Sequence, residues 1–147
     1  MRPFHLAFPV SDLEATRHFY GTVMGCGIGR ELPGKWIDFD LYGHQMSAHN
    51  LPDFPRPPVA GGVDGDAVPI PHFGVVLSMP QWRELAARLE AEPSVQWCLR
   101  PKVRFEGQPG EQATLFIFDP SGNALEFKGF NDDSAIFAAQ PALATAE

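Results

Sequence analysis

The chain has 147 residues, of which 44% are hydrophobic, and it carries a formal charge of −7 at pH 7. Such a composition is typical of a compact globular domain that is long enough to bury a core. The acidic balance argues against nucleic acid as a partner, because neutralising backbone phosphates requires clustered Lys and Arg.

No apolar run approaches the roughly 20 residues that a membrane-spanning helix needs, and no signal-peptide pattern precedes the first apolar segment. We therefore expect a cytoplasmic protein that does not enter the membrane. The two cysteines, Cys26 and Cys98, lack CxxC spacing, so we expect free thiols.

An internal repeat organises the chain. Residues 5–14 read HLAFPVSDLE and residues 72–81 read HFGVVLSMPQ, which aligns His5 with His72. A repeat of this kind indicates two copies of one supersecondary unit.

Each copy contains a candidate helix start. Ser11 is followed three residues later by Glu14, and Ser78 is followed by Gln81, which is the spacing of a capping box. Each half is therefore predicted to begin with a strand and continue into a helix, over about residues 12–24 and 80–92.

Short segments of alternating polarity follow each predicted helix and predict three further strands per half. The predicted strands are residues 26–30, 35–42 and 45–50, then 95–99 or 103–105, 112–118 and 123–128. The predicted fold class is therefore α+β, with the order βαβββ twice.

We expect one domain over residues 1–128, made of a first module at about 4–50 and a second at about 72–128. Residues 51–71 are rich in Pro and Gly, which favours an extended connector rather than a strand or helix. Residues 129–147 are expected to form a tail, with a short helix near 132–139 and a frayed end.

Strand alternation assigns the polar side chains to faces. It places His5, His72 and Glu126 on the sheet face opposite the helices. The other face receives large apolar residues, among them Phe4, Leu6, Phe8, Val10, Phe73, Val75, Leu77, Leu125 and Phe127.

Two histidines and one carboxylate that converge would supply three ligands on one side of a divalent metal, leaving positions open for substrate, water or dioxygen. Taken singly, each side chain could instead be a half-exposed strand residue or a surface charge. The matched repeat positions of the two histidines favour the metal site.

The chain resembles the vicinal oxygen chelate superfamily, which includes glyoxalase I, bleomycin-resistance proteins and extradiol dioxygenases. The similarity covers residues 4–128 and is carried by residues 4–10 (FHLAFPV), 71–75 (PHFGV) and 118–127 (FDPSGNALEF). It implies paired βαβββ modules that form a U-shaped sheet around a metal cavity. It also implies that His5, His72 and Glu126 occupy ligand positions on the first, fifth and eighth strands.

Alignment of the two halves puts Ser47 opposite Glu126, at the fourth ligand position that the resemblance implies. Serine is a poor metal ligand, and a set of two His and one carboxylate suits a non-haem Fe(II) oxygenase. The leading hypothesis is therefore an extradiol-type dioxygenase that acts on a small, vicinal diol-like substrate. His49, one rung beyond Ser47, could be a fourth ligand, a general acid or base, or a wall residue.

Two further side chains are candidates for substrate contact. Tyr42 could orient a substrate or anchor the turn at Gly43. Arg104 flanks the loop 107–110 and could clamp a substrate carboxylate or form an ion pair.

Two other functions stay open. The first is a glyoxalase-like or epimerase-like lyase or isomerase that uses Zn, Ni, Co or Mn, with a side chain moving a proton. The second is a metal-free, drug-binding resistance protein. For the enzymes the expected partner is a small-molecule substrate, and sheet edges that need cover lead us to expect a homodimer.

Overall fold

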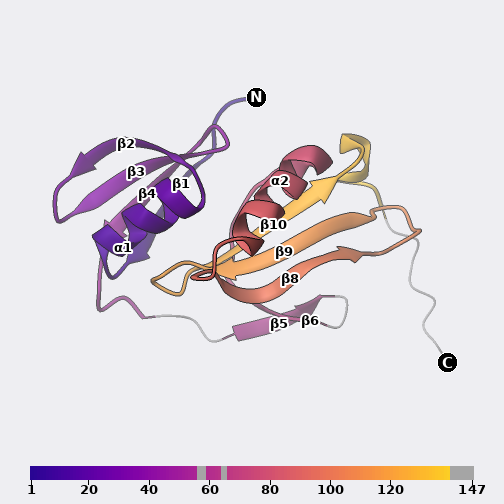
Figure 1. Cartoon of the computed structure of the whole chain (residues 1–147). Coiled ribbons are helices and arrows are strands. Elements are labelled where there is room, and N and C mark those ends of the chain that lie inside the picture. The colour runs from indigo at the N-terminus through magenta and orange to yellow at the C-terminus, as the bar shows by residue number, and fades with distance from the viewer. Residues whose placement is uncertain (56–58, 64–65, 140–147) are drawn as a thin grey trace.

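The computed structural model describes residues 1–55, 59–63 and 66–139 of the chain (Figure 1). It contains two βαβββ modules that lie side by side, each with a helix across its own sheet. The predicted α+β fold class is confirmed.

The first module contains β1 (His5–Val10), α1 (Leu13–Arg17) with a following π-helix (His18–Val23), β2 (Gly27–Leu32), β3 (Trp36–Leu41) and β4 (His44–Asn50). The second contains β7 (Val76–Ser78), α2 (Met79–Glu90), β8 (Gln96–Arg104), β9 (Gln112–Phe118) and β10 (Ala124–Phe130). A short 3-10 helix (Asp133–Ala135) follows.

The two sheets have the same topology. Their strand orders are β1-β4-β3-β2 and β7-β10-β9-β8. The pairs β1·β4 and β7·β10 are parallel, and the other pairs within these two sheets are antiparallel. The sequence repeat therefore corresponds to a structural repeat.

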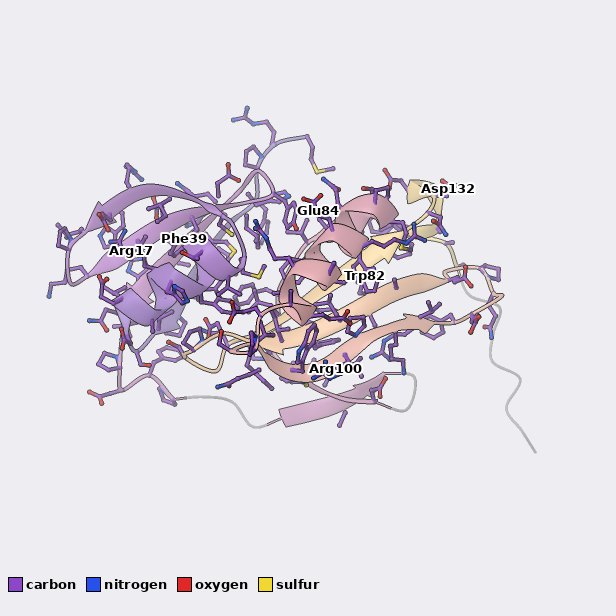
Figure 2. All side chains as sticks on the ribbon, in the orientation of Figure 1. Arg17, Phe39, Trp82, Glu84, Arg100 and Asp132 are labelled. Carbon is purple, nitrogen blue, oxygen red and sulfur yellow. The ribbon has the colours of Figure 1, made fainter. Side chains whose placement is uncertain are left out.

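Each helix packs against its own sheet. The α1 helix contacts β3 and β4, and α2 contacts β7, β9 and β10. On α2 the predicted stripe of Trp82, Leu85 and Leu89 is buried. The Trp82 indole faces β10 and donates a hydrogen bond of 2.9 Å to the Phe127 carbonyl (Figure 2).

The two helix starts differ from each other. The capping box at Ser78 and Gln81 is present as predicted. The prediction for Ser11 is wrong, because Asp12 is the N-cap and its side chain accepts a hydrogen bond from the Ala15 amide. Asp and Ser are equally favoured at this position, so sequence preference could not separate two adjacent candidates.

The connector prediction is also wrong. Two strands, β5 (Val59–Val63) and β6 (Asp66–Pro69), pair into an antiparallel hairpin beside β8 (Figure 1). Val68 on this hairpin is 1% exposed, so β6 packs against the domain. Both strands of this two-stranded hairpin are edge strands, where proline is tolerated.

Three smaller expectations can be compared with the structure. The two alternatives for the sixth predicted strand, 95–99 and 103–105, both fall mostly within β8 (Gln96–Arg104), which accommodates Pro101 because it is an edge strand. The tail begins later than expected, since β10 runs to Phe130, and the predicted helix near 132–139 is only the 3-10 turn. The expected frayed end lies mostly in 140–147, outside the described residues.

Cys26 and Cys98 are free thiols, as expected. Within the described ranges, no helix has the length and apolar character needed to cross a membrane.

The two modules are joined by a buried carboxylate. Asp119, in the turn between β9 and β10, is 1% exposed and accepts a hydrogen bond of 2.9 Å from the Tyr20 hydroxyl of the first module. The backbone amides of Ser121 and Asn123 and the Asn123 side chain also donate to it. The same Asn123 amide donates 2.8 Å to the Pro9 carbonyl, which ties the turn to β1.

The buried contact shifts the pKa values of both Asp119 and Tyr20. Burial raises the pKa of Asp119, and the hydrogen bonds from Asn123, Tyr20 and Ser121 oppose that shift. Burial, together with the neighbouring Asp119, raises the pKa of Tyr20 well above its usual value. Tyr20 therefore stays a neutral hydrogen-bond donor.

Replacing Tyr20 with Phe should lower the free energy of unfolding by about 1.5–3 kcal/mol, the usual contribution of a hydrogen bond to a charged group. The measurement is urea unfolding followed by circular dichroism. The chain has two tyrosines, so Tyr42→Phe, at a residue that is 40% exposed, is the matched control and should change stability little. Equal effects of the two substitutions would contradict this account.

Candidate metal centre

His72 and Glu126 form the centre of the candidate site. Strand pairing places Phe73 opposite Leu125, so His72 precedes the first rung of the β7·β10 pairing. Leu125 and Phe127 are buried under the helix, so Glu126 lies on the opposite, open face of the sheet. The Nε2 atom of His72 lies 3.0 Å from Oε2 of Glu126.

Both side chains are oriented by a second partner. The Nδ1 atom of His72 lies 2.7 Å from the Pro69 carbonyl oxygen, which only accepts, so Nδ1 carries the proton. The Thr114 hydroxyl donates a hydrogen bond of 2.8 Å to Oε1 of Glu126. Metal-binding histidines commonly donate their other ring N–H to a carbonyl or carboxylate in this way.

The pair fits a divalent cation. Because Nδ1 donates to the Pro69 carbonyl, Nε2 is the ring nitrogen available to a metal ion, and it lies beside a carboxylate oxygen. Two such atoms about 3 Å apart suit one ion with ligand bonds of about 2.1 Å.

The open face of the first sheet repeats this geometry. Ala7 pairs with Ser47, and the parallel register of the second sheet continues the Phe73·Leu125 bridge to Gly74 and Glu126. His5 precedes Ala7 by two residues as His72 precedes Gly74. The predicted equivalence of Ser47 and Glu126 therefore holds in the strand register.

The structure does not bring all three predicted ligands together within one chain. His5 lies on β1 in the first sheet and is exposed, whereas Glu126 lies on β10 of the second sheet and His72 lies just before β7 of that sheet. Among the residues that the structure describes, no three His, Cys, Asp or Glu side chains are grouped to hold a metal. The role of His5 stays a prediction.

The fourth position holds a hydroxyl and a carboxylate. Ser47 donates a hydrogen bond of 2.5 Å to Asp38, which faces it across the β3·β4 pairing. Both side chains are buried, and the exposed Arg30 lies 3.6 Å from the second oxygen of Asp38. The carboxylate of Asp38 is thus hydrogen-bonded to Ser47, which occupies the position where the resemblance implies a fourth ligand.

His49 lies on the same open face, one rung beyond Ser47. It pairs with Trp36 across β3·β4, and the two ring centroids are 6.5 Å apart. This position agrees with the predicted strand face and does not distinguish among the three roles proposed for His49.

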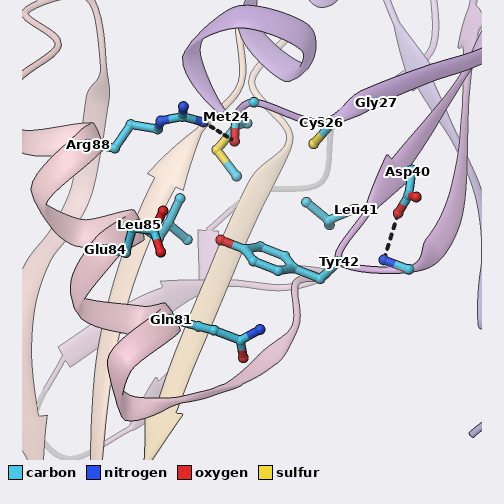
Figure 3. A pocket seen from close by; sticks show the side chains of 12 residues that line it. Met24, Cys26, Gly27, Asp40, Leu41, Tyr42, Gln81, Glu84, Leu85 and Arg88 are labelled. Atoms are coloured by element: carbon cyan, nitrogen blue, oxygen red, sulfur yellow. Dashed lines mark hydrogen bonds between the residues drawn. The ribbon is translucent and has the colours of Figure 1, made fainter.

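Tyr42 lies elsewhere. It forms the β3–β4 turn with Gly43, and both residues have positive φ, at 52° and 88°, as a type I′ turn requires. Its ring extends toward α2 and lines a cavity of about 450 Å³ (Figure 3). The Tyr42 hydroxyl points toward Glu84 and Leu85 (Figure 3), and its ring centroid is 6.4 Å from that of Phe127.

The cavity beside Tyr42 has a neutral thiol on its wall. Burial raises the pKa of Cys26 to about 12. His72 does not line this cavity, and the turn role of Tyr42 is the one that its backbone supports.

Arg104 is buried at the end of β8. Its side chain is 2% exposed and lies 3.2 Å from Asp66 of the β5–β6 hairpin. Lys102 donates a hydrogen bond of 2.7 Å to the same carboxylate. Arg104 therefore helps to fix the hairpin, and the suggested substrate clamp stays a prediction.

Two contributors to the site were missed in the sequence. Thr114 shares the strand face of Phe116, which pairs with Glu126, so strand alternation could have indicated it. The Pro69 carbonyl, by contrast, carries no residue-type signal.

The contact of Asp66 on the β5–β6 hairpin with Lys102 and Arg104 on β8 should weaken in acid. Lys102 lowers the pKa of Asp66 through a hydrogen bond. Because the folded-state pKa is depressed, the stabilisation is present above the ordinary pKa of about 3.9 and is lost as pH falls through the folded-state value. The NMR signals of Ala67 and Val68 should therefore stay constant from about pH 7 to pH 5 and shift below about pH 4.

Asp66→Asn should remove this acid transition, whereas Asp53→Asn, at an exposed connector residue, should leave it in place. A transition that persists in Asp66→Asn would show that another group controls the hairpin.

Comparison with known structures gives the same fold over nearly the whole chain. A glyoxalase/bleomycin resistance protein/dioxygenase from Alicyclobacillus acidocaldarius is 30% identical, with 92% of this chain and 96% of that chain covered and a TM-score of 0.76. A lactoylglutathione lyase from Agrobacterium tumefaciens is 20% identical, with 86% and 91% covered and a TM-score of 0.58. The fosfomycin resistance protein FosX from Listeria monocytogenes is 14% identical, with 89% and 93% covered and a TM-score of 0.65.

A search of curated proteins finds no match. The profile of the Glyoxalase/Bleomycin resistance protein/Dioxygenase superfamily, however, matches residues 2–127. The chain belongs to this superfamily, as its repeated βαβββ modules and its strand register had indicated.

Proposed function

We propose that the protein is a divalent-metal-dependent enzyme that acts on a small chelating substrate. The observation that carries the proposal is the His72–Glu126 pair, 3.0 Å apart on the open face of the second sheet. The Pro69 carbonyl and the Thr114 hydroxyl orient the two side chains. Such outer contacts fix the direction of ligand lone pairs before an ion binds.

We propose that the third ligand is His5 of a second copy of the chain. Two protein ligands hold a metal weakly, and His5 is exposed at the repeat position that corresponds to His72. In a two-fold dimer, the first module of each chain would face the second module of its partner, which gives two equivalent sites. This arrangement would also cover the open faces of both sheets.

A bound divalent ion would act as a Lewis acid on the two oxygens of a chelating substrate, and Fe(II) would add the capacity for oxidation by dioxygen. His5, His72 and Glu126 would hold the ion. Ser47, at the fourth position, is neutral, and its proton is directed to Asp38. A three-ligand set leaves positions for substrate and dioxygen, which supports an extradiol-type Fe(II) dioxygenase as the leading chemistry.

A redox-neutral lyase or isomerase using Zn, Ni, Co or Mn is the second candidate, and one observation favours it. Asp38 is a buried carboxylate on the open face of the first sheet, bonded to Ser47. A carboxylate there has the chemistry to accept a proton from a substrate carbon. The fold shared with a lactoylglutathione lyase agrees with this candidate at the level of architecture only.

Mixed dimers test the metal site. Co-expressed His5→Ala and Glu126→Ala chains, purified through two different affinity tags, should bind roughly half as much metal as wild type, because one of two sites keeps all its ligands. Each variant alone should bind little, as measured by elemental analysis after dialysis.

The alternative outcomes are distinct. A site built within one chain would leave the mixed dimer as poor in metal as either variant. Full occupancy in Glu126→Ala would show that Glu126 is not a ligand. Wild-type protein that binds none of these metals would favour a metal-free binding protein.

Substrate turnover separates the two chemistries. Protein reconstituted anaerobically with Fe(II) should consume oxygen with a panel of catechols. Stoichiometric iron without oxygen uptake across the panel would count against the dioxygenase. Protein loaded with Zn, Ni, Co or Mn should then catalyse the exchange of carbon-bound hydrogen in α-hydroxyketones for deuterium from the solvent, as the second candidate requires. NMR of the substrate measures this exchange.

For the second candidate, Asp38→Asn should slow the exchange by on the order of 100-fold, the lower range for a general base. Asp40→Asn, on the same strand and exposed, is the matched control. Equal rates in the two variants would remove Asp38 as the base.

A further inference from the structure

A cavity of about 450 Å³ lies between the two modules, and His72 is one of the residues that line it. Its walls come from β1, from the start of the connector, from the segment before β7 and from the β9–β10 turn. The residues that define its character are Leu51, Phe54, Pro71, His72, Phe118 and Asn123.

The chemistry of the walls is apolar. None of the lining residues is Asp, Glu, Lys or Arg. Two side chains supply polar atoms, His72 and Asn123. The Asn123 side-chain amide is already bonded to Pro9 and Asp119, and the Nδ1 atom of His72 to Pro69.

An anionic group in this cavity would therefore lose its hydration shell without gaining a cationic side chain as a partner. Such desolvation of a charge is costly in free energy. A neutral hydrocarbon group would gain from burial, at about 25 cal/mol for each Å² removed from water. A dry cavity of about 150 Å³ is enough for benzene, so this cavity accepts a ring with substituents or a fused pair of rings.

We propose that this cavity binds the uncharged aryl or alicyclic part of the substrate, with the chelating oxygens directed to His72. The inference rests on the proposed function in taking His72 as the reactive end. Binding in the cavity itself needs no metal. The substrate class is thus a neutral ring compound, and substrates with a phosphonate or carboxylate at this end are disfavoured.

The test compares two probes of the same shape on metal-free, full-length protein. By calorimetry, 2-naphthol should bind at one site per chain, and 2-naphthoate should bind at least about tenfold more weakly because its charge is desolvated. In NMR spectra, 2-naphthol should shift the methyl signals of Ala7 and Ala124, which line the cavity, and leave those of Ala87 on the outer face of α2 unchanged.

A charge placed on the wall provides the decisive variant. Leu51 is 51% exposed and Leu32, remote from the cavity, is 50% exposed, so both tolerate Lys. Leu51→Lys should reduce or invert the preference for 2-naphthol, because its ammonium would pair with the carboxylate. Leu32→Lys should behave as wild type.

Three results would overturn the proposal: no saturable 2-naphthol binding, equal affinity of wild type for the two probes, or an unchanged preference in Leu51→Lys. Failure of the metal proposal would look different, because metal binding would be lost while the naphthol preference persisted.

Discussion

The arrangement of the two modules depends on the buried carboxylate of Asp119. An unpaired charge at this depth would cost several kcal/mol, so the β9–β10 turn, Tyr20 and Asn123 must all be in place for the modules to join. The same turn leads directly into β10, which carries Glu126. One set of hydrogen bonds therefore fixes both the junction between modules and the turn from which the strand of a candidate metal ligand begins.

Local pattern was enough to predict one half of the site. Side chains alternate across a strand whatever the tertiary context, and this placed Glu126, within β10, on the open face. His72 was predicted on the same face, and the structure places it just before β7 rather than within a strand. The structure adds that they lie 3.0 Å apart. The helix start at Ser78 was predictable for the same reason, because its capping box involves only residues three positions apart.

The remainder depends on contacts between distant residues, which no local pattern encodes. The β5–β6 hairpin lies in a Pro-rich and Gly-rich segment, and Asp66 reaches Lys102 and Arg104 on β8. Arg104 was expected to flank the loop 107–110 as a substrate clamp or a surface ion pair, and it is instead buried beside Asp66 of that hairpin. Whether His5 joins the other ligands depends on how the modules and chains assemble. Strand alternation predicts which face of the sheet His5 lies on, but it carries no information on assembly.

The contact between the Pro69 carbonyl and His72 joins the connector to the chemistry of the site. Pro69 is the last residue of β6, and its oxygen determines which ring nitrogen of His72 carries the proton. The two residues between Pro69 and His72 therefore act as a spacer of fixed length. An insertion there would turn the imidazole away from Glu126, whereas changes of length earlier in the connector, before Asp66 anchors the hairpin to β8, would leave the imidazole in place. Natural variation and loop grafting in this protein are thus constrained at one end of the connector far more than at the other.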